Sequence, residues 1–462
     1  MSVMMSEQTS LGVAGKRVAV IGLGRSGLAA VRLLQRLGAH IAVADQKPPS
    51  DLAGVLGGFP AGEVEIHGAG AYEAALSGAE VVVVSPGVPL TLDPLRRARA
   101  SGARVIGELE LAARYLTGKI IAVTGTNGKS TTVTWIGELL RGAGYAPFVG
   151  GNLGTPLAEA ALASLEGKAW GLVVAEVSSF QLETIETFRP WIGAILNITP
   201  DHLDRYPSME AYATAKLRLF ENQTDEDYAV LNADDPWLSH ATSVSPGARI
   251  EFSRTRPVER GMFLDEDAIV STLHGQREEV CRVGVLQVRG AHNIENAMAA
   301  AAVAALAGCP MDVINHGLRA FRGLEHVMEV VRVLRGVAYI NDSKGTNVDA
   351  TIKALESVPA PIILIAGGRE KGGEYQGLAE AVRRKAKRVI LLGEARARLR
   401  KVLEGTCPLT EAASLADAVR NAAATAVAGD TVLLSPACAS FDMFADYKDR
   451  GKQFKACVHE LG

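Results

Sequence analysis

The chain has 462 residues, of which 48% are hydrophobic and 21% are charged, and its formal net charge is −3 at pH 7. This length exceeds one ordinary hydrophobic core and predicts two to four domains. The nearly balanced charge argues against a nucleic-acid partner, and no apolar run is long enough to insert into a membrane.

The cysteines indicate a reducing compartment. They are five in number, scattered, without zinc-binding spacing, and the first ten residues do not resemble a secretory signal. Free cysteines tend to be buried, so we expect packing roles. The sequence therefore predicts a cytoplasmic protein with reduced thiols at Cys281, Cys309, Cys407, Cys438 and Cys457.

Residues 1–116 predict a first domain of alternating strands and helices. A helix is expected at 27–38, directly after the first strand. This alternation is typical of a Rossmann-like parallel sheet. The predicted strands are 17–24, 40–46, 79–87 and 103–108.

A glycine-rich turn joins the first strand to the first helix. Gly22, Gly24 and Gly27 have the G-x-G-x-x-G spacing, and Asp45 follows the next strand. Such a turn brings backbone amides to a diphosphate, while the acid accepts a hydrogen bond from a ribose hydroxyl. The motif fits a dinucleotide or a UDP-sugar, and a tight turn without ligand is the structural alternative. Gly87 lies at the same predicted sheet edge.

Residues 117–322 predict a central domain in which the pattern restarts. Residues 249–290 alternate and are rich in charges and turns, which predicts a small antiparallel patch. A later helix is expected at 292–308, with Asn293 as N-cap and Gly308 as its stop. The other predicted elements are strands at 119–125, 170–178, 191–199 and 228–235 and a helix at about 129–141.

Residues 323–462 predict a third domain, again Rossmann-like. The strands are expected in the strings GVAYIND, PIILIAGG, RVILLGE and DTVLLSP, each followed by helical sequence. The predicted fold class is thus α/β with three domains, of which the central one resembles a P-loop ATPase and carries the antiparallel patch.

The string GTNGKST (125–131) is a phosphate-binding loop two residues shorter than the usual G-x-x-x-x-G-K-[ST]. Gly125 and Gly128 allow backbone amides to face a phosphate. Lys129 supplies a cation for the β- and γ-phosphates, and Ser130 or Thr131 can hold Mg²⁺. The strand before and the helix after the loop favour this interpretation over an ordinary glycine-rich turn.

Further polar residues follow the strands of the central domain. Glu176 ends an apolar strand and is a candidate Mg²⁺ ligand. His202, between Asp201 and Asp204, could ligate a second metal or contact a transferred phosphate. By spacing alone, Lys216 is expected to be a solvated or snorkelling side chain.

Together these motifs resemble the Mur ligases of peptidoglycan synthesis, over essentially the whole chain. The short phosphate loop is that family's own form, and SSFQLE and PACASFD are similar to its D-glutamate-adding branch. A DNPR-like string, usual in ligases for a diamino acid, is absent. The matching strings are GTNGKST, GGNLGTP, EVSSFQLE, ILNITPDHLDRYPS, AHNIENAMAA, INDSKGTN and LLSPACASFD.

The resemblance implies an ATP-dependent, amide-forming reaction in cytoplasmic peptidoglycan precursor synthesis. ATP phosphorylates the carboxylate of UDP-N-acetylmuramoyl-L-alanine, and the amine of D-glutamate attacks the acyl phosphate to give a tetrahedral intermediate. Cations must neutralise the charge that develops in both steps. A monomer with two Mg²⁺ ions is expected. Hinges near 116–119 and 322–326 are expected to close the domains around the reaction.

The resemblance also assigns residues by matching positions. Lys216 matches a lysine that is carbamylated in the family, contrary to its spacing-based interpretation. The catalytic group is Lys129, Glu176, His202 and Lys216, and the metal ligands are Ser130, Glu176, His202 and Lys216 as its carbamate. The ATP site comprises Gly125, Thr126, Asn127, Gly128, Lys129, Ser130, Thr131, Asn296 and Asp342. The UDP-substrate site comprises Gly24, Ser26, Asp45, Gly87 and Asn152. The D-glutamate site comprises Lys344, Thr346, Lys371, Ser440, Phe441 and Tyr447.

One position departs from the family pattern. Where the family usually has an arginine that reaches the γ-phosphate, the string GLEHVMEVV places Val327. Valine cannot donate a hydrogen bond to phosphate. Either Arg322 substitutes for it or ATP binds more weakly, and the hypothesis is reduced but retained activity.

Three alternatives remain at this stage. The L-alanine-adding branch of the family also has a glycine-rich UDP site, but SSFQLE and PACASFD do not fit it in this form. An NAD(P)-dependent oxidoreductase would use Gly22–Gly27 and leave GTNGKST unexplained. A non-catalytic nucleotide-binding regulator is supported only by Val327.

Overall fold

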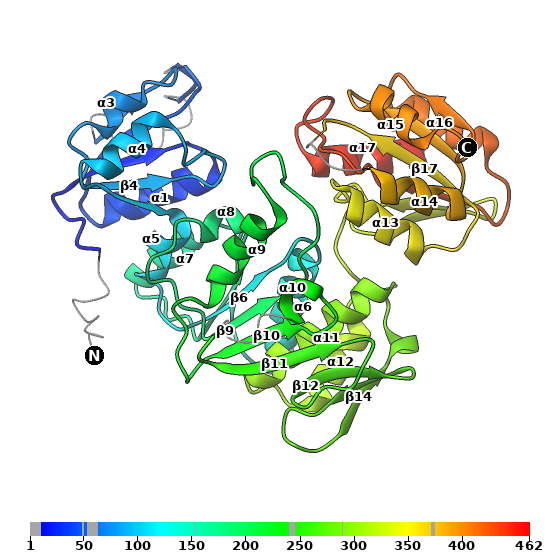
Figure 1. The fold of residues 1–462 in the computed structure, drawn as a ribbon, viewed down its shortest axis with the longest axis horizontal. Coiled ribbons are helices and arrows are strands. Elements are labelled where there is room, and N and C mark those ends of the chain that lie inside the picture. The colour runs from blue at the N-terminus through cyan, green and yellow to red at the C-terminus, as the bar shows by residue number, and fades with distance from the viewer. Residues whose placement is uncertain are drawn as a thin grey trace.

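The chain folds into three α/β units in succession (Figure 1). The computed structural model describes residues 11–462 except 49, 53–62, 153, 240–244, 289, 371–374 and the side chains of Ser239 and Gln376. Each unit is built around its own sheet, and the predicted three-part α/β fold class is confirmed. The exact boundaries 1–116, 117–322 and 323–462 stay a prediction.

The N-terminal sheet has five parallel strands in the order β3-β2-β1-β4-β5. Apart from Arg17 and His40 at their starts, its central strands β2, β1 and β4 are apolar and buried, as parallel strands covered on both faces require. The strands are β1 (Arg17–Ile21), β2 (His40–Ala44), β3 (Val64–His67), β4 (Val81–Val84) and β5 (Arg104–Gly107). The helices are α1 (Arg25–Arg36), α3 (Tyr72–Leu76), α4 (Asp93–Ala100) and α5 (Glu108–Ala113).

The central sheet has nine strands in the order β14-β13-β12-β11-β10-β9-β6-β8-β7. Antiparallel pairing is confined to β12, β13 and β14, because β11 pairs in parallel with both of its neighbours. The predicted patch is therefore shorter than 249–290. The strands are β6 (Lys119–Thr124), β7 (Phe148–Gly151), β8 (Leu172–Glu176), β9 (Ile192–Ile195), β10 (Tyr228–Asn232), β11 (Ala248–Ser253), β12 (Gly261–Asp265), β13 (Ala268–Ser271) and β14 (Glu278–Arg282).

Helices cover both faces of the central sheet, and its longest helix begins differently from the prediction. Helix α11 starts at Ala291 after Gly290, so Asn293 lies inside the helix and is not its N-cap. Gly308 adopts a φ of 92° directly after the helix, as predicted for a stop. The helices are α6 (Lys129–Gly142), α7 (Leu157–Leu165), α8 (Ser179–Leu182), α9 (Met209–Leu217), α10 (Pro236–Ser239), α11 (Ala291–Leu306) and α12 (Met311–Ala320).

The C-terminal sheet has six strands in the order β15-β16-β20-β17-β18-β19. Only β15 runs antiparallel to its neighbour, at one edge. The strands are β15 (Glu329–Leu334), β16 (Val337–Asn341), β17 (Ile362–Gly367), β18 (Ala386–Leu392), β19 (Leu409–Glu411) and β20 (Thr431–Leu434). The helices are α13 (Val348–Ser357), α14 (Gln376–Lys385), α15 (Arg396–Leu403), α16 (Leu415–Thr425) and α17 (Tyr447–His459).

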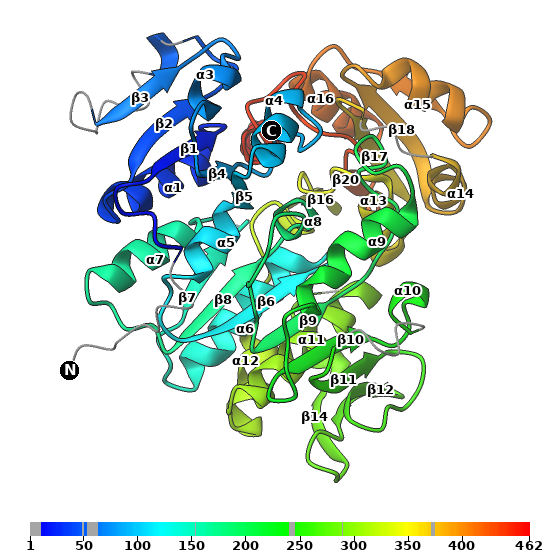
Figure 2. The ribbon, with the colours of Figure 1, turned by 60° about the vertical axis from the view of Figure 1, so that its left-hand side comes forward.

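The two domain junctions differ in kind. Helices α1, α5 and α7 lie between the first two sheets (Figure 2), and one continuous apolar core spans both domains. The apolar clusters of the C-terminal domain contain only residues from 328 onward. We infer that the first two domains move as one unit and that closure occurs at the junction near 322–326.

A buried carboxyl group lies at the first junction. Glu108 is 2% exposed, its Oε1 accepts from the Ala158 backbone N–H at 2.6 Å, and its Oε2 has no hydrogen-bond partner. Burial raises the pKa of Glu108 to about 7, from an ordinary 4.5. Because the folded-state pKa is raised, the protonated carboxyl of Glu108 makes its full contribution to the free energy of unfolding below pH 4.5. This contribution is lost as the pH rises through 7.

We therefore compare the free energy of unfolding of Glu108→Gln with that of the parent. We expect this difference to be about 2 kcal/mol more favourable to the variant at pH 8 than at pH 5. The measurement is the urea midpoint of both proteins across this pH range. The exposed Glu166→Gln serves as a control and is expected to show no such trend. A constant difference between Glu108→Gln and the parent at all pH values would show that Glu108 does not titrate as described.

Among the described residues, no helix is both long and apolar enough to cross a membrane. All five cysteines are free thiols, as predicted, and three of them are buried.

Candidate active site

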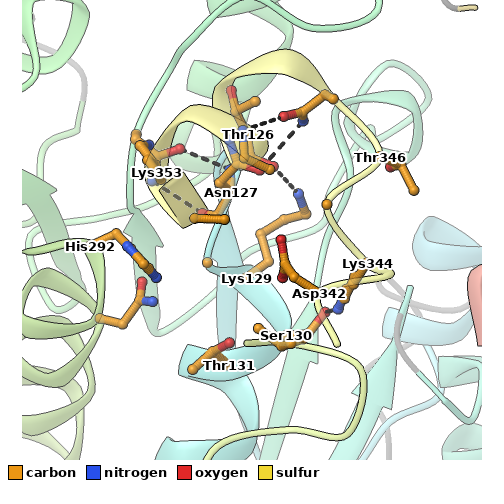
Figure 3. Close-up of a pocket in the computed structure, with 18 of the residues that line it drawn as sticks. Thr126, Asn127, Lys129, Ser130, Thr131, His292, Asp342, Lys344, Thr346 and Lys353 are labelled. Atoms are coloured by element: carbon orange, nitrogen blue, oxygen red, sulfur yellow. Dashed lines mark hydrogen bonds between the residues drawn. The ribbon is translucent and has the colours of Figure 1, made fainter. Parts of the chain in front are cut away.

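A cavity of about 270 Å³ lies between the central and C-terminal domains (Figure 3). The phosphate loop and the ends of β8 and β9 form one wall, and the loop after β16 forms the other. The structure brings most of the predicted residues together here. Those that line the cavity are Thr126, Asn127, Gly128, Lys129, Ser130, Thr131, Asn152, Glu176, His202, Asn296, Asp342, Lys344, Thr346 and Tyr447.

The phosphate loop is held open by glycine and by a neighbouring strand end. Gly128 has a φ of 85°, and a side chain there would place Cβ 2.3 Å from Asn296 Oδ1. The backbone N–H of Asn127 donates to Asn197 Oδ1 at 2.9 Å, which fixes the loop against the end of β9. Lys129 Nζ donates to the carbonyls of Gly125 and Thr126, both at 2.8 Å. The ammonium group therefore lies directly over the loop that would hold phosphate.

Glu176 is the acidic centre of the site. Its Oε2 accepts from Ser130 Oγ at 2.5 Å and its Oε1 accepts from Asn152 Nδ2 at 2.7 Å. Burial acts to raise the pKa of this carboxyl, but the charges of Lys344 and Lys129 outweigh it and the pKa is lowered. Glu176 is thus an ionised carboxylate beside a serine hydroxyl, which is a donor set suited to Mg²⁺.

Lys344 reaches this centre from the C-terminal domain. Its Nζ donates to Ser130 Oγ and lies 5.9 Å above the ring of Tyr447. Burial lowers its pKa to about 8, against the attraction of Glu176. A cation from the third domain therefore meets the phosphate loop and the acidic strand end in one place.

His202 follows β9 in a left-handed conformation, with φ of 56°. Its backbone N–H donates to Asp201 Oδ1 at 2.9 Å, and its ring packs against Phe180. The histidine and the neighbouring Asp201 both line the cavity. They could supply a second set of metal ligands a short distance from Glu176.

Lys216 lies behind the phosphate loop, and here the spacing-based interpretation is wrong. The side chain is 1% exposed, not solvated, because α9 packs this face against the loop. Its Nζ donates to the carbonyl of Gly125 at 2.9 Å and lies over the ring of Tyr212. Burial, with the nearby charge of Lys129, lowers its pKa well below the ordinary value. The lowered pKa favours the neutral, nucleophilic form of this amine.

Two amides and an acid also line the cavity, close to the phosphate loop and to Lys344. Asn296 Nδ2 donates to Asn293 Oδ1 at 3.1 Å, and Asn296 Oδ1 accepts from Thr132 at 3.3 Å. Burial raises the pKa of Asp342 to about 7, while Ser435 Oγ donates to its carboxyl at 2.7 Å. Val327 lies in the same wall, whereas Arg322 is exposed and is not among the lining residues.

The glycine-rich turn of the N-terminal domain has the geometry that its motif predicts. Asp45 Oδ2 accepts from the Leu23 amide at 2.7 Å. A Cβ on Gly27 would lie 1.9 Å from the Gly22 carbonyl, so only glycine fits. Of the other predicted UDP-site residues, Gly24 and Ser26 belong to this turn and Gly87 follows β4, while Asn152 lies apart at Glu176.

The remaining predicted residues lie around the C-terminal domain. Ser440 is buried, whereas Phe441 is 65% exposed, and neither lines the cavity. Lys371 falls outside the described residues. Arg450 was not predicted, although its buried guanidinium donates to the Ser343 carbonyl at 2.8 Å and supports the turn that carries Lys344. A single arginine in a C-terminal helix gives no sequence signal of this kind.

A short phosphate loop, an acidic strand end and a lysine from a third α/β domain define a nucleotide-dependent group-transfer enzyme whose pocket forms between domains. Comparisons with known proteins specify the family. Models of the Mur ligase MurD-like N-terminal domain, the Mur ligase middle domain and the Mur ligase glutamate ligase domain match residues 16–107, 123–304 and 328–438.

Relatives match along nearly the full length. A UDP-N-acetylmuramoylalanine--D-glutamate ligase of Pelotomaculum thermopropionicum is 47% identical over 96% of this chain and 98% of its own. The enzyme of the same name from Syntrophotalea carbinolica is 44% identical over 97% and 98%. A solved pseudomurein peptide ligase type C from Methanothermus fervidus shares the fold, with a TM-score of 0.61, 18% identity and coverage of 97% and 100%. The chain belongs to the Mur ligase family.

Proposed function

We propose that this chain is an ATP-dependent ligase that joins D-glutamate to UDP-N-acetylmuramoyl-L-alanine. The observation that carries the proposal is the convergence of Lys129, Glu176 and Lys344 in one cavity between two domains. The names of the relatives, at 44% and 47% identity, support the same substrate pair. The reaction belongs to the synthesis of peptidoglycan precursors.

The phosphate loop would hold ATP, with the Lys129 ammonium moving from the carbonyls of its own loop onto the β- and γ-phosphates. The amides of Asn293 and Asn296 and the carboxyl of Asp342 line the same cavity, with Asn296 beside Gly128 and Asp342 near Lys344, and would contact the nucleotide there. Both groups thus lie along one cavity, as a single bound nucleotide requires.

Two Mg²⁺ ions would be held by Ser130 with Glu176, and by His202 with Lys216 as its carbamate. The ions would neutralise charge on the transferred phosphate and on the oxyanion. Ser130, Glu176 and His202 fit such ions, since they bring hydroxyl, carboxylate and imidazole groups to one cavity, while Lys216 lies behind the phosphate loop at the Gly125 carbonyl. Lys344 would add a positive charge where the acyl phosphate reacts.

The N-terminal domain would bind the UDP end of the substrate at Gly24, Ser26, Asp45 and Gly87, and Asn152 would hold the reacting end. D-glutamate would bind beside Lys344, Thr346 and Tyr447, with Ser440, Phe441 and Lys371 completing the site. Two substrate carboxylates require cations, which the lysines provide. We also propose a cytoplasmic monomer, for which the free thiols give support.

Phosphate release with ATP, UDP-N-acetylmuramoyl-L-alanine and single amino acids tests this function. Release that depends on D-glutamate is expected, and little with L-alanine or a diamino acid. Binding of NADH with no amino-acid-dependent release would instead favour an oxidoreductase.

Val327 offers a test of the nucleotide end of the cavity. We expect Val327→Arg to lower the KM for ATP about three- to tenfold, because a charged donor would reach phosphate from the cavity wall. Steady-state kinetics with ATP as the varied substrate measures this effect. Val327→Ala and Arg322→Ala are the controls, and both should leave the KM for ATP near its parent value. An unchanged KM in Val327→Arg would disprove the idea of a missing phosphate contact.

A further inference from the structure

The start of helix α13 in the C-terminal domain lies directly on the phosphate loop of the central domain. Asp349 Oδ2 accepts from Asn127 Nδ2 at 2.5 Å and from Thr199 Oγ1 at 2.9 Å. Asn347 Nδ2 donates to Asp201 Oδ2 at 3.0 Å. Two residues of one domain thus bind three residues of the other, and Asn127, Asp201 and Asn347 among them line the cavity.

The local structure of α13 prepares both side chains for these contacts. Asn347 is the N-cap and accepts from the Ala350 N–H at 2.8 Å, which leaves its amide nitrogen free to donate outward. Asp349 lies in the first turn, where a carboxylate is favoured by the helix dipole. Lys353, one turn later, donates to Asp349 Oδ2 at 3.0 Å and holds the carboxylate in place.

These contacts matter because the two domains have no apolar core in common in the described part of the chain. Each of these hydrogen bonds has a carboxylate as its acceptor, Asp349 of the C-terminal domain or Asp201 of the central domain. Hydrogen bonds to a carboxylate are stronger than those between neutral groups. Asp349 is also only 22% exposed, so water competes weakly for its oxygens. The contacts therefore have both the strength and the position to hold the domains together.

The contacts also determine where Lys344 lies. Lys344 is three residues before Asn347, on the same loop, and its Nζ bonds to Ser130 in the phosphate loop. Docking α13 on Asn127 and Asp201 brings that loop against the cavity. Without docking, Lys344 would withdraw from Ser130 and Glu176 together with its domain.

We propose that Asn347 and Asp349 form a latch that closes the C-terminal domain on the phosphate loop and thereby positions Lys344 for the reaction. The latch rests on the proposed function, since it links the ATP loop to the domain that carries the D-glutamate site. Both are positioning residues, because they act through Asn127, Thr199 and Asp201.

Kinetics of Asp349→Ala test the latch. We expect kcat to fall and the KM for D-glutamate to rise, each about tenfold, since a charge-assisted contact is lost. The KM for UDP-N-acetylmuramoyl-L-alanine should stay unchanged, because its site lies in the rigid unit of the first two domains. Asp349→Asn keeps one acceptor oxygen and should recover part of the loss. Glu356→Ala, on an exposed turn of the same helix, is the matched control with parent kinetics.

A double-mutant cycle and solution scattering separate the latch from a local folding defect. Thr199→Val removes one donor to Asp349, and its effect on kcat should be much smaller when Asp349 is already alanine. X-ray scattering with an ATP analogue and the UDP substrate should show a compact parent chain and an expanded Asp349→Ala variant. Additive kinetic effects, or equal compaction of both proteins, would overturn the latch. Failure of the parent to release phosphate with D-glutamate would instead overturn the proposed function, and scattering would still report on closure.

Discussion

We expect Lys129→Met to lower the rate of D-glutamate-dependent phosphate release by at least about 10³-fold. The side chain keeps its length but loses the ammonium, which lies 2.8 Å from two carbonyls of the phosphate loop. That charge would neutralise the phosphoryl group in transfer, and the nearby Lys344 is already engaged with Ser130 and Glu176. The measurement is kcat at saturating ATP and both substrates.

A second reason for the large effect is electrostatic. The charge of Lys129 contributes to the lowered pKa of Glu176 and to that of Lys216. Its removal would therefore raise the pKa of Glu176, the proposed metal ligand, and would also weaken phosphate binding. Lys168→Met, an exposed lysine over Trp170, is the control and should retain parent activity. A loss of less than tenfold in Lys129→Met would mean that the loop does not carry the transferred phosphate.

The sequence allowed the fold class and the centre of the site to be predicted because both depend on local patterns. The strands β1, β6 and β8 can be recognised because each is an apolar run that is followed by glycine or ends in an acid. The candidate phosphate-binding residues at 125–131 are consecutive in the sequence. The sequence does not predict the edge strands β3, β7, β15 and β19. Their side chains alternate weakly or lie at a sheet edge, so pairing rather than pattern determines them.

What the sequence could not predict depends on contacts between distant residues. The spacing of Lys216 indicates a solvated lysine, and only the packing of α9 against the phosphate loop buries it. Three residues that shape the site bind partners far away in the sequence. The separation is 70 residues for Asn197, 222 for Asp349 and 107 for Arg450. No spacing rule connects such pairs. The family resemblance assigned a carbamate to Lys216, which its own neighbourhood in the sequence does not suggest, and that assignment stays a prediction.

Lys216→Met is expected to reduce ligation by about 10³-fold, and the parent chain is expected to depend on dissolved CO₂. Burial lowers the pKa of the Lys216 amine and so favours the unprotonated form, which can add to CO₂ with loss of a proton and form a carbamate that offers oxygen ligands to a metal. Removing CO₂ from the buffer should therefore lower parent activity, and bicarbonate should restore it. Lys216→Met should not respond to either treatment.

A spectroscopic readout separates the carbamate from a structural role, because Lys216 Nζ also donates to the Gly125 carbonyl at 2.9 Å. Carbon-13 NMR of the parent in labelled bicarbonate should show a protein-bound carbamate signal that is missing in Lys216→Met. Thr214→Ala, on the exposed face of the same helix, should keep both the signal and the activity. If Lys216→Met is inactive while the parent shows neither the signal nor CO₂ dependence, the lysine acts by holding the phosphate loop. The second metal would then have to be bound by His202 and Asp201 without it.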